Sequence, residues 1–331
     1  MAFVVTLMLL SSLPLRKLSQ LSSTMPPHHP IARRAPIFII GHWRSGTTYL
    51  HNLLTRDPRF CWPSLEYCIA PEGGLHRRIF ALAAQTCLPS HRPMDRVPIR
   101  LDAPQEEEWL LATRTSLSFN HCFFFPQSSA LIFDRLLSPT EAVAIEWSET
   151  YHGLLRALAC SAPEQTALLK SPGNAGRIPF LLENFPDARF VHIVRNPYEV
   201  FSSSVYLWER LLPWWSLQRY PDIDIVSNVL AFYQKLMRKY LSDRRAIAED
   251  KLIEVRYEDL VTDPLGTLEI IYEGLRLTDF SGSKPFFEQF LISQQGYRRN
   301  RFQLPEKHRI EVNHAWNFSF KHWNYEPKEC P

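Results

Sequence analysis

The sequence predicts a single-domain α/β fold with a central parallel sheet flanked by helices. Three observations support this prediction: short apolar runs of strand length recur along the chain, segments of helical periodicity separate them, and a glycine-containing loop joins the first run to a helix. Strands that alternate with helices are typical of a parallel sheet, because each crossover lays a helix against the sheet. The 331 residues are enough for one large domain.

The first strand and the first helix are predicted on either side of this loop. Residues 36–41 (PIFIIG) form an apolar run that ends in glycine, as is typical of a buried strand. A helix is predicted over residues 47–55, because their apolar side chains share one face. The pair Asp57-Pro58 then stops the helix, since a residue before proline disfavours helical backbone.

Three later apolar runs predict the remaining strands. Residues 166–170 (TALLK) and 189–194 (RFVHIV) are each followed by a loop and a helical segment, and residues 251–260 (KLIEVRYEDL) are predicted as the last strand. Residues 138–160 and 225–245 have helical periodicity and supply helices between the strands.

Composition and charge exclude several classes of protein. With 45% hydrophobic and 21% charged residues, the chain has the composition of a globular protein, not of a disordered chain, a collagen or a multi-span membrane protein. The net charge is +3 without a long basic block, so nucleic acid is not expected as a partner. The six cysteines lack C-x-x-C spacing, which favours reduced thiols in the cytoplasm over disulfides or a zinc site.

Residues 1–15 form an apolar segment, and a linker rich in Pro, Ser and His follows it. The segment is too short to cross a bilayer and lacks the preceding basic residues of a signal peptide. Two alternatives stay open: a helix packed on the domain, or peripheral membrane contact through an interfacial segment. We therefore expect segment and linker over residues 1–35, the domain over 36–326 and a tail over 327–331.

The loop after the first strand, GHWRSGTT (residues 41–48), has the spacing of a phosphate-binding loop. In such loops backbone N–H groups and the N-terminus of the following helix converge on an anion. An NTPase loop carries Lys after the second glycine, but here Thr47 holds that position and the cation is Arg44, inside the loop. The loop is expected to hold a phosphate-like group, and an ordinary ATPase or GTPase is disfavoured.

A second anion-binding element is predicted at Arg195, which follows the strand over residues 189–194. The carboxyl end of a parallel strand faces the crevice where such sheets bind ligands. Ser203 follows about two turns into the next helix, and Arg and Ser can both donate hydrogen bonds to a phosphate. Taken alone, a strand-terminal Arg followed by Asn-Pro is more often a turn that carries a surface charge.

Together the two elements resemble the 5′-phosphosulfate and 3′-phosphate sites of sulfotransferases that use 3′-phosphoadenosine 5′-phosphosulfate (PAPS). Residues 37–54 and 168–204 are similar to the bacterial-type sulfotransferases, and VRYEDL (255–260) and GYRRNR (296–301) follow in the family's order. The resemblance covers about residues 36–326. It implies a P-loop-NTPase-like sulfotransferase fold and transfer of a sulfuryl group from PAPS to a hydroxyl, with release of adenosine 3′,5′-bisphosphate and no metal.

The resemblance also implies roles for single residues. The loop residues hold the 5′-phosphosulfate, Arg195 and Ser203 bind the 3′-phosphate, Tyr257 lies near the adenine, and Arg298 or Arg299 closes over the 3′-phosphate. The implied loop contacts are Arg44, Ser45, Gly46, Thr47 and Thr48.

Lys170, in LLKSP, matches the lysine of the K-T-H element of the cytosolic sulfotransferases. A cation there neutralises charge that develops on the sulfuryl group and the leaving oxygen. The histidine that serves as the base in those enzymes is replaced by Pro172. The base that removes the acceptor proton must therefore be sought elsewhere.

Two carboxylate positions are candidates for this base. Glu66 follows Arg44 at a spacing similar to that of the catalytic glutamate of Golgi-type sulfotransferases. Glu106, with the two glutamates that follow it in DAPQEEEW, is the second candidate. Alternatively, DAPQEEEW is simply a helix start, with Asp102 as N-cap and acids in the first turn. His42 and His121 are weaker candidates.

The acceptor site is predicted from two aromatic stretches, residues 119–126 and 206–221. They either line a pocket for an apolar alcohol, such as a lipid, quinol or sterol-like alcohol, or pack on the sheet; a carbohydrate acceptor is also open. The second stretch is placed to act as a lid. Two rival functions remain: a P-loop small-molecule or nucleotide kinase, and a non-catalytic nucleotide-binding or membrane-adaptor protein.

Overall fold

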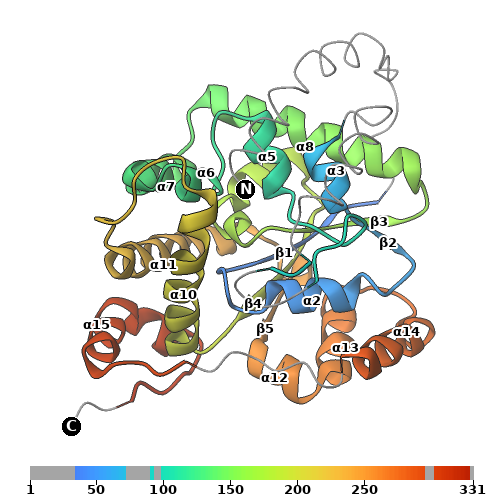
Figure 1. The fold of residues 1–331 in the computed structure, drawn as a ribbon. Helices are drawn as coiled ribbons and strands as arrows, with labels where there is room; N and C mark the ends of the chain where they lie inside the picture. The colour runs from blue at the N-terminus through green and yellow to red at the C-terminus, as the bar shows by residue number, and fades with distance from the viewer. Residues whose placement is uncertain (1–33, 72–89, 93–97, 295–301, 329–331) are drawn as a thin grey trace.

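A five-stranded parallel sheet forms the centre of the fold (Figure 1). The computed structural model describes residues 34–71, 90–92, 98–294 and 302–328. The strand order is β2-β3-β1-β4-β5. The strands are β1 (Ile37–Gly41), β2 (Phe60–Cys61), β3 (Thr166–Lys170), β4 (Arg189–Val194) and β5 (Leu252–Arg256).

The central position of β1 determines where a ligand can bind. In the sheet, Ile37 is paired with Leu168 of β3 on one side and with Arg189 of β4 on the other. The chain reverses its direction of winding between these neighbours, and the carboxyl ends of β3, β1 and β4 lie together at that point. Such a switch point is where open parallel sheets form a crevice.

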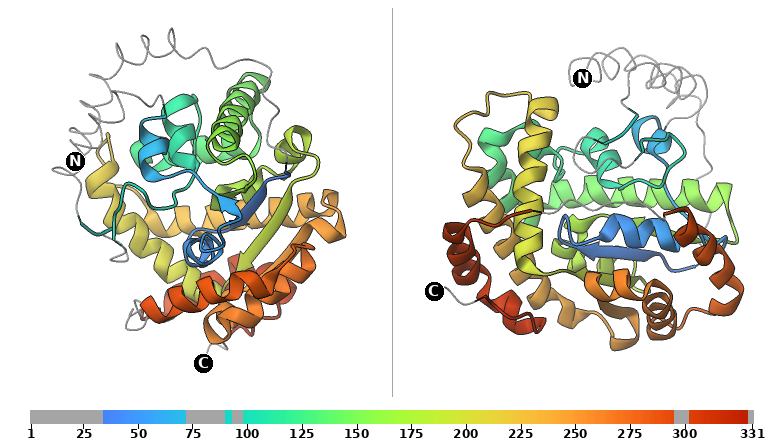
Figure 2. Two further views of the ribbon diagram at one scale, coloured as in Figure 1. Left: turned by 90° about the vertical axis from the view of Figure 1, so that its right-hand side faces the viewer. Right: turned by 60° about the horizontal axis from the view of Figure 1, so that its bottom comes forward.

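Helices cover both faces of the sheet (Figure 2). Four short 3₁₀ turns, η1 (Pro126–Ser128), η2 (Pro172–Gly176), η3 (Arg244–Ala246) and η4 (Glu249–Lys251), join some of them. The helices are α2 (Thr47–Leu54), α3 (Leu65–Ile69), α5 (Glu108–Arg114), α6 (His121–Phe124), α7 (Ser129–Leu137), α8 (Glu141–Ser161), α9 (Ile178–Asn184), α10 (Pro197–Trp215), α11 (Ile225–Asp243), α12 (Tyr257–Thr262), α13 (Pro264–Gly274), α14 (Phe280–Ser293) and α15 (Glu306–His322).

The predicted α/β fold class is confirmed, and two differences in the elements have physical causes. The run predicted as one last strand over residues 251–260 divides into β5 and α12, because Tyr257 begins a helix with Glu258 and Asp259 in its first turn, where acids are favourable. The edge strand β2 was not predicted, since two residues are too few to show a periodicity.

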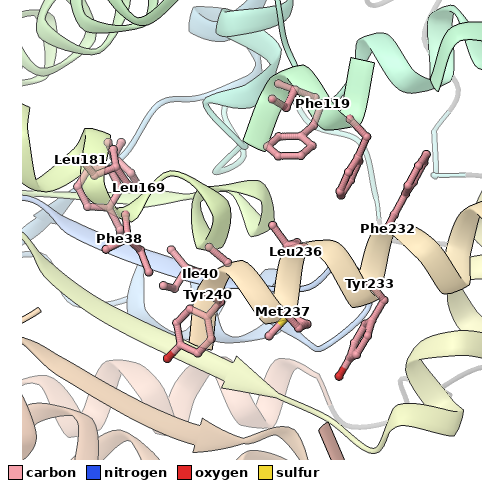
Figure 3. Packing of buried hydrophobic residues seen from close by; sticks show 14 of the residues in the cluster. Phe38, Ile40, Phe119, Leu169, Leu181, Phe232, Tyr233, Leu236, Met237 and Tyr240 are labelled. Carbon is pink, nitrogen blue, oxygen red and sulfur yellow. The ribbon is translucent and has the colours of Figure 1, made fainter. Parts of the chain in front are cut away.

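The two faces of the sheet bury separate hydrophobic clusters. Ile37 and Ile39 of β1 pack with α2, α12, α13 and α14, whereas Phe38 and Ile40 pack with α9, α10 and α11. Figure 3 shows Phe38 and Leu169 beside Leu181 of α9, and Ile40 near Tyr240 of α11. Because neighbouring residues of a strand point to opposite faces, a strand covered on both sides must be apolar throughout.

Residues 1–15 and most of the predicted linker, together with Arg298 and Arg299, lie outside the described residues. Within the described ranges, no helix is long and apolar enough to cross a membrane.

A buried carboxylate, Asp57, ties the end of α2 to the C-terminal helices. Its oxygens accept hydrogen bonds from Arg59 Nε at 3.0 Å, from Ser283 Oγ at 2.8 Å and from the Tyr272 hydroxyl. Burial alone would raise the pKa of Asp57, but these donors outweigh it and lower the pKa. Asp57-Pro58 was predicted only to stop the helix; in the fold the same aspartate also joins α2 to α13 and α14.

We predict that Asp57→Asn lowers the free energy of unfolding by about 2–3 kcal/mol, because it removes the anion of Arg59 and replaces one of two buried acceptor oxygens with a donor. Urea denaturation measures the change. Asp134→Asn is the control, since the Asp134–Lys235 pair is exposed to solvent and such pairs contribute little. Equal losses in the two variants would contradict a structural role for Asp57.

Candidate active site

Three strand ends meet at the crevice, and each one carries a predicted site residue. The loop over residues 41–48 follows β1, Lys170 ends β3, and Arg195 follows β4. Since β1 lies between β3 and β4, these groups converge although they are far apart in the sequence. The crevice therefore collects positive charge at the carboxyl edge of the sheet.

The loop after β1 has a backbone that requires its two glycines. Gly41 has φ 154° and Gly46 has φ 102°. A Cβ atom on Gly41 would come within 2.6 Å of the Ile193 carbonyl oxygen, and one on Gly46 within 2.2 Å of the Tyr257 ring. Ser45 Oγ closes the loop by donating to the His42 carbonyl at 2.7 Å.

Helix α2 begins directly at the end of this loop, at Thr47. The first N–H groups of any helix have no partner within the helix, and the helix dipole makes this end favourable for an anion. The loop and the start of α2 therefore offer backbone donors and a favourable dipole to an anion, and anion binding there stays a prediction.

The two predicted anion elements are in direct contact. Arg44 Nε donates to Ser203 Oγ of α10 at 2.9 Å, and Arg195 Nη1 donates to the Arg44 carbonyl at 3.1 Å. Ser203 is buried. These bonds hold the loop and the start of α10 together, so two guanidinium groups share one crevice.

Tyr257 lies between the loop and Arg195. The Arg195 guanidinium carbon is 4.5 Å from the centroid of the Tyr257 ring, and the same ring rests against Gly46. On its other side, Arg195 forms an ion pair with Glu199, 3.1 Å away on α10. The tyrosine assigned to the adenine region thus borders both anion elements.

Lys170 and Glu106 form an ion pair at the end of β3. Lys170 is only 2% exposed, and its Nζ also lies 3.4 Å from Thr48 Oγ1, at the start of α2. Burial lowers the pKa of Lys170, the charge of Glu106 opposes this effect, and the positive charge of Arg92 adds to it, with a lowered pKa as the result. Of the two predicted base positions, Glu106 is thus the one that contacts the predicted cation, which itself reaches Thr48.

The alternative interpretation of DAPQEEEW as a helix start is wrong in its register. Helix α5 begins only at Glu108, and Asp102 is not its cap but an exposed partner of Arg100. Tertiary contacts of the buried glutamates fix the segment instead. Glu108 forms an ion pair with Arg177 at 2.6 Å, and both side chains are buried. Burial would raise the pKa of Glu108, but Arg177 outweighs it and lowers the pKa.

Glu66 lies in the first turn of α3, whose N-cap Ser64 accepts a hydrogen bond from the Tyr67 N–H at 3.1 Å. Helix α3 packs beside α5. In the described part of the chain, no hydrogen bond or ion pair joins Glu66 to Lys170 or to the loop.

The histidines named as weaker candidates are engaged in local structure. His42 is buried, which lowers its pKa to about 4, and its Nδ1 lies 2.8 Å from the Trp43 carbonyl oxygen. His121 Nδ1 accepts from the Ser118 N–H, so Nε2 carries the proton that it donates to the Ala112 carbonyl. The lowered pKa keeps the His42 ring neutral near pH 7.

Sequence reasoning missed Arg92, His51 and Arg177, the ion-pair partner of Glu108. His51 is buried on α2 near Lys170, and burial together with the charge of Lys170 keeps its pKa well below the usual range. Its position one turn after Thr48 was an available signal, because such residues share a helix face. Arg92 and Arg177 had no local signal, since packing alone brings them to the site.

The two aromatic stretches come together behind the loop and enclose a cavity of about 30 Å³. Its walls come from the loop and from α6, α7, α10 and α11. Ser204 Oγ is buried at this cavity and has no hydrogen-bond partner among the described residues. The lining residues are His42, Trp43, Phe119, Cys122, Phe123, Phe133, Ser204, Leu207, Trp208, Val229 and Phe232.

Solved structures of similar fold are mycobacterial sulfotransferases. Sulfotransferase STF9 from Mycobacterium avium superimposes with a TM-score of 0.75 at 19% identity, covering 98% of this chain and 85% of that one. STF1 from Mycobacterium tuberculosis gives a TM-score of 0.65 at 19% identity, covering 87% and 78%. At these identities the likeness shows the fold.

Sequence comparison shows the family. Omega-hydroxy-beta-dihydromenaquinone-9 sulfotransferase Stf3 from Mycobacterium bovis is 34% identical over 296 residues, 88% of this chain and 75% of Stf3. Carbohydrate sulfotransferase 5 from Mus musculus is 23% identical over 328 residues, 89% of this chain and 78% of that protein. The model of the sulfotransferase family matches residues 36–281. The chain therefore belongs to the sulfotransferase family.

Proposed function

We propose that this sulfotransferase takes its sulfuryl group from PAPS and transfers it to the hydroxyl of an apolar alcohol. The observation that carries the proposal is the contact between the two anion elements, in which Arg44 bonds to Ser203 and Arg195 bonds to the loop. PAPS carries two separate anionic groups, a 5′-phosphosulfate and a 3′-phosphate. A crevice with two adjacent guanidinium groups and a helix N-terminus is complementary to such a molecule.

The loop and the start of α2 would hold the phosphosulfate through backbone N–H groups and Arg44. Arg195 and Ser203 would bind the 3′-phosphate, and the Tyr257 ring would border the adenine. The glycines support this arrangement, because they leave the backbone free of side chains where it turns.

In the transfer, the acceptor oxygen forms a bond to sulfur while the bond from sulfur to the phosphate oxygen breaks. Glu106 would take the acceptor proton, as a general base. Lys170 and the loop would stabilise the negative charge on the sulfuryl oxygens and on the leaving phosphate. Positioning supplies the rest of the acceleration, because acceptor and donor are held together in one crevice.

The apolar acceptor is inferred from the aromatic walls behind the loop, where the cavity of about 30 Å³ has room for only a few atoms, so that a longer chain would have to displace some of these side chains. Aromatic rings line most of this cavity, among them Trp43, Phe123 and Trp208. Sites with such walls bind apolar ligands and use a few polar groups for orientation. The name of the relative Stf3 points to a hydroxylated menaquinone, which is an alcohol of this class, whereas the mouse relative is named for carbohydrates.

We predict that the protein binds adenosine 3′,5′-bisphosphate and that Arg195→Ala weakens this binding by about 10- to 100-fold, the effect of losing a charged hydrogen bond. Isothermal titration calorimetry with the bisphosphate, ADP and ATP–Mg²⁺ measures it. Arg135→Ala, at an exposed position of α7, is the control and should bind like the wild type. Preference for ATP–Mg²⁺ would favour the kinase alternative instead.

Replacing the base should slow the chemical step and spare binding. We expect Glu106→Gln to lower kcat by about 10²-fold or more at saturating PAPS, the usual contribution of a general base, with bisphosphate affinity unchanged. Glu66→Gln is the matched comparison and should keep most of its activity. A large loss in Glu66→Gln together with an active Glu106→Gln would reverse the assignment.

Acceptor preference tests the apolar cavity. In a series of primary alcohols, kcat/KM should rise about fourfold for each methylene that becomes buried, as expected from about 0.8 kcal/mol per group. Sugars of similar size serve as the comparison. Transfer is measured with PAPS that carries a radiolabelled sulfuryl group. Efficient transfer to a sugar and no dependence on chain length would exclude an apolar acceptor.

A further inference from the structure

Glu107 is a buried carboxylate whose two oxygens are both used as acceptors next to Lys170. Glu107 Oε2 accepts a hydrogen bond from the backbone N–H of Lys170 at 3.0 Å. Glu107 Oε1 accepts from Asn174 Nδ2, in the turn η2, at 2.7 Å. Glu107 is 1% exposed, so water does not replace either bond if it is lost.

The neighbours of Glu107 fix the direction of these hydrogen bonds. Asn174 Oδ1 accepts from the Tyr151 hydroxyl at 2.9 Å and from Arg177 Nη1 at 3.2 Å. The amide nitrogen of Asn174 must therefore face Glu107 as a donor. Because the Lys170 backbone is also a donor, position 107 needs acceptors on both sides, which a carboxylate offers and a carboxamide does not.

We propose that Glu107 is a positioning residue for sulfuryl transfer, holding the end of β3 against η2 so that the Lys170 side chain lies between Glu106 and Thr48. The inference rests on the proposed role of Lys170 and adds a residue that touches neither the loop nor the ligand crevice. Glu106 binds Lys170 at its Nζ and Glu107 binds it at its backbone. Lys170 is thus held at both ends by consecutive residues.

Two fixed ends matter because catalysis is sensitive to small displacements of a charged group. A shift of about 1 Å can lower a rate 10²-fold. Glu108 anchors the same segment independently through Arg177, so losing one bond at Glu107 changes the position of Lys170 without releasing α5. The expected effect therefore falls on the chemical step more than on folding or cofactor affinity.

The positioning should also depend on pH. Burial and the neighbouring carboxylates raise the pKa of Glu107 to about 7, against the opposing effect of Lys170. A proton on Glu107 removes one acceptor, so activity should fall as the pH drops through about 7. The titratable and charged groups that face Glu107 are Glu106, Glu108, Lys170, Arg177, Tyr151 and Cys68.

The decisive experiment reverses the polarity of one hydrogen bond. In Glu107→Gln, a new amide N–H faces either Asn174 or Lys170, and we expect kcat to fall about tenfold or more while bisphosphate affinity stays within twofold. In the double variant E107Q/N174D, the glutamine donates to the carboxylate introduced at position 174 and accepts from Lys170, so kcat should recover. The fall in activity that the wild type shows as the pH drops through about 7 should be absent in Glu107→Gln. Glu141→Gln, at an exposed position of α8, is the control.

Hydrogen exchange gives a readout that does not depend on catalysis. The Lys170 amide should lose protection in Glu107→Gln and regain it in the double variant. Wild-type kcat in Glu107→Gln with full protection would overturn the proposal. Loss of activity in both variants would also overturn it, since a charge at position 107 would then be required.

Failure of the proposed function would instead appear in the wild type, as absent transfer from PAPS or absent bisphosphate binding.

Discussion

The placement of β1 between β3 and β4 is the constraint on which the rest of the structure depends. Because all three strands run in parallel, their carboxyl ends are at one edge, and whatever follows them in the sequence must share that edge. The loop, Lys170 and Arg195 meet for this reason alone. The apolar side chains that bury β1 on both faces therefore also determine where the charged groups lie.

A cluster of buried charged residues lies at the end of β3. Lys170, Glu107, Glu108 and Arg177 are all almost fully removed from water, which is costly unless each charge has partners. Here the partners come from β3, η2, α5 and α8, elements that also share one apolar cluster. The hydrogen bonds are directional, and direction is what an apolar contact lacks. The cluster thus gives the crevice a defined geometry in addition to its charge.

The sequence predicted those parts of the fold and the site that depend on local pattern. Four of the five strands, the loop and the position of Arg195 followed from apolar runs, glycine spacing and the place after a strand, all of which are local properties. The start of α5 could not be predicted, because Arg177 and Asn174 fix it from a distant segment. For the same reason Glu66 and Glu106 were equivalent in the sequence: only the packing of α5 on the end of β3 brings Glu106 to Lys170.

Arg44 adopts a backbone conformation that is strained for any residue other than glycine, with φ 71°. Such a position costs of order 1 kcal/mol or more and persists only where surrounding contacts enforce it, here the bonds to Ser203 and Arg195. Glycine would relieve the strain but remove the guanidinium. The loop therefore trades stability for a fixed charge, and selection for heat resistance alone would favour substitutions that remove the guanidinium.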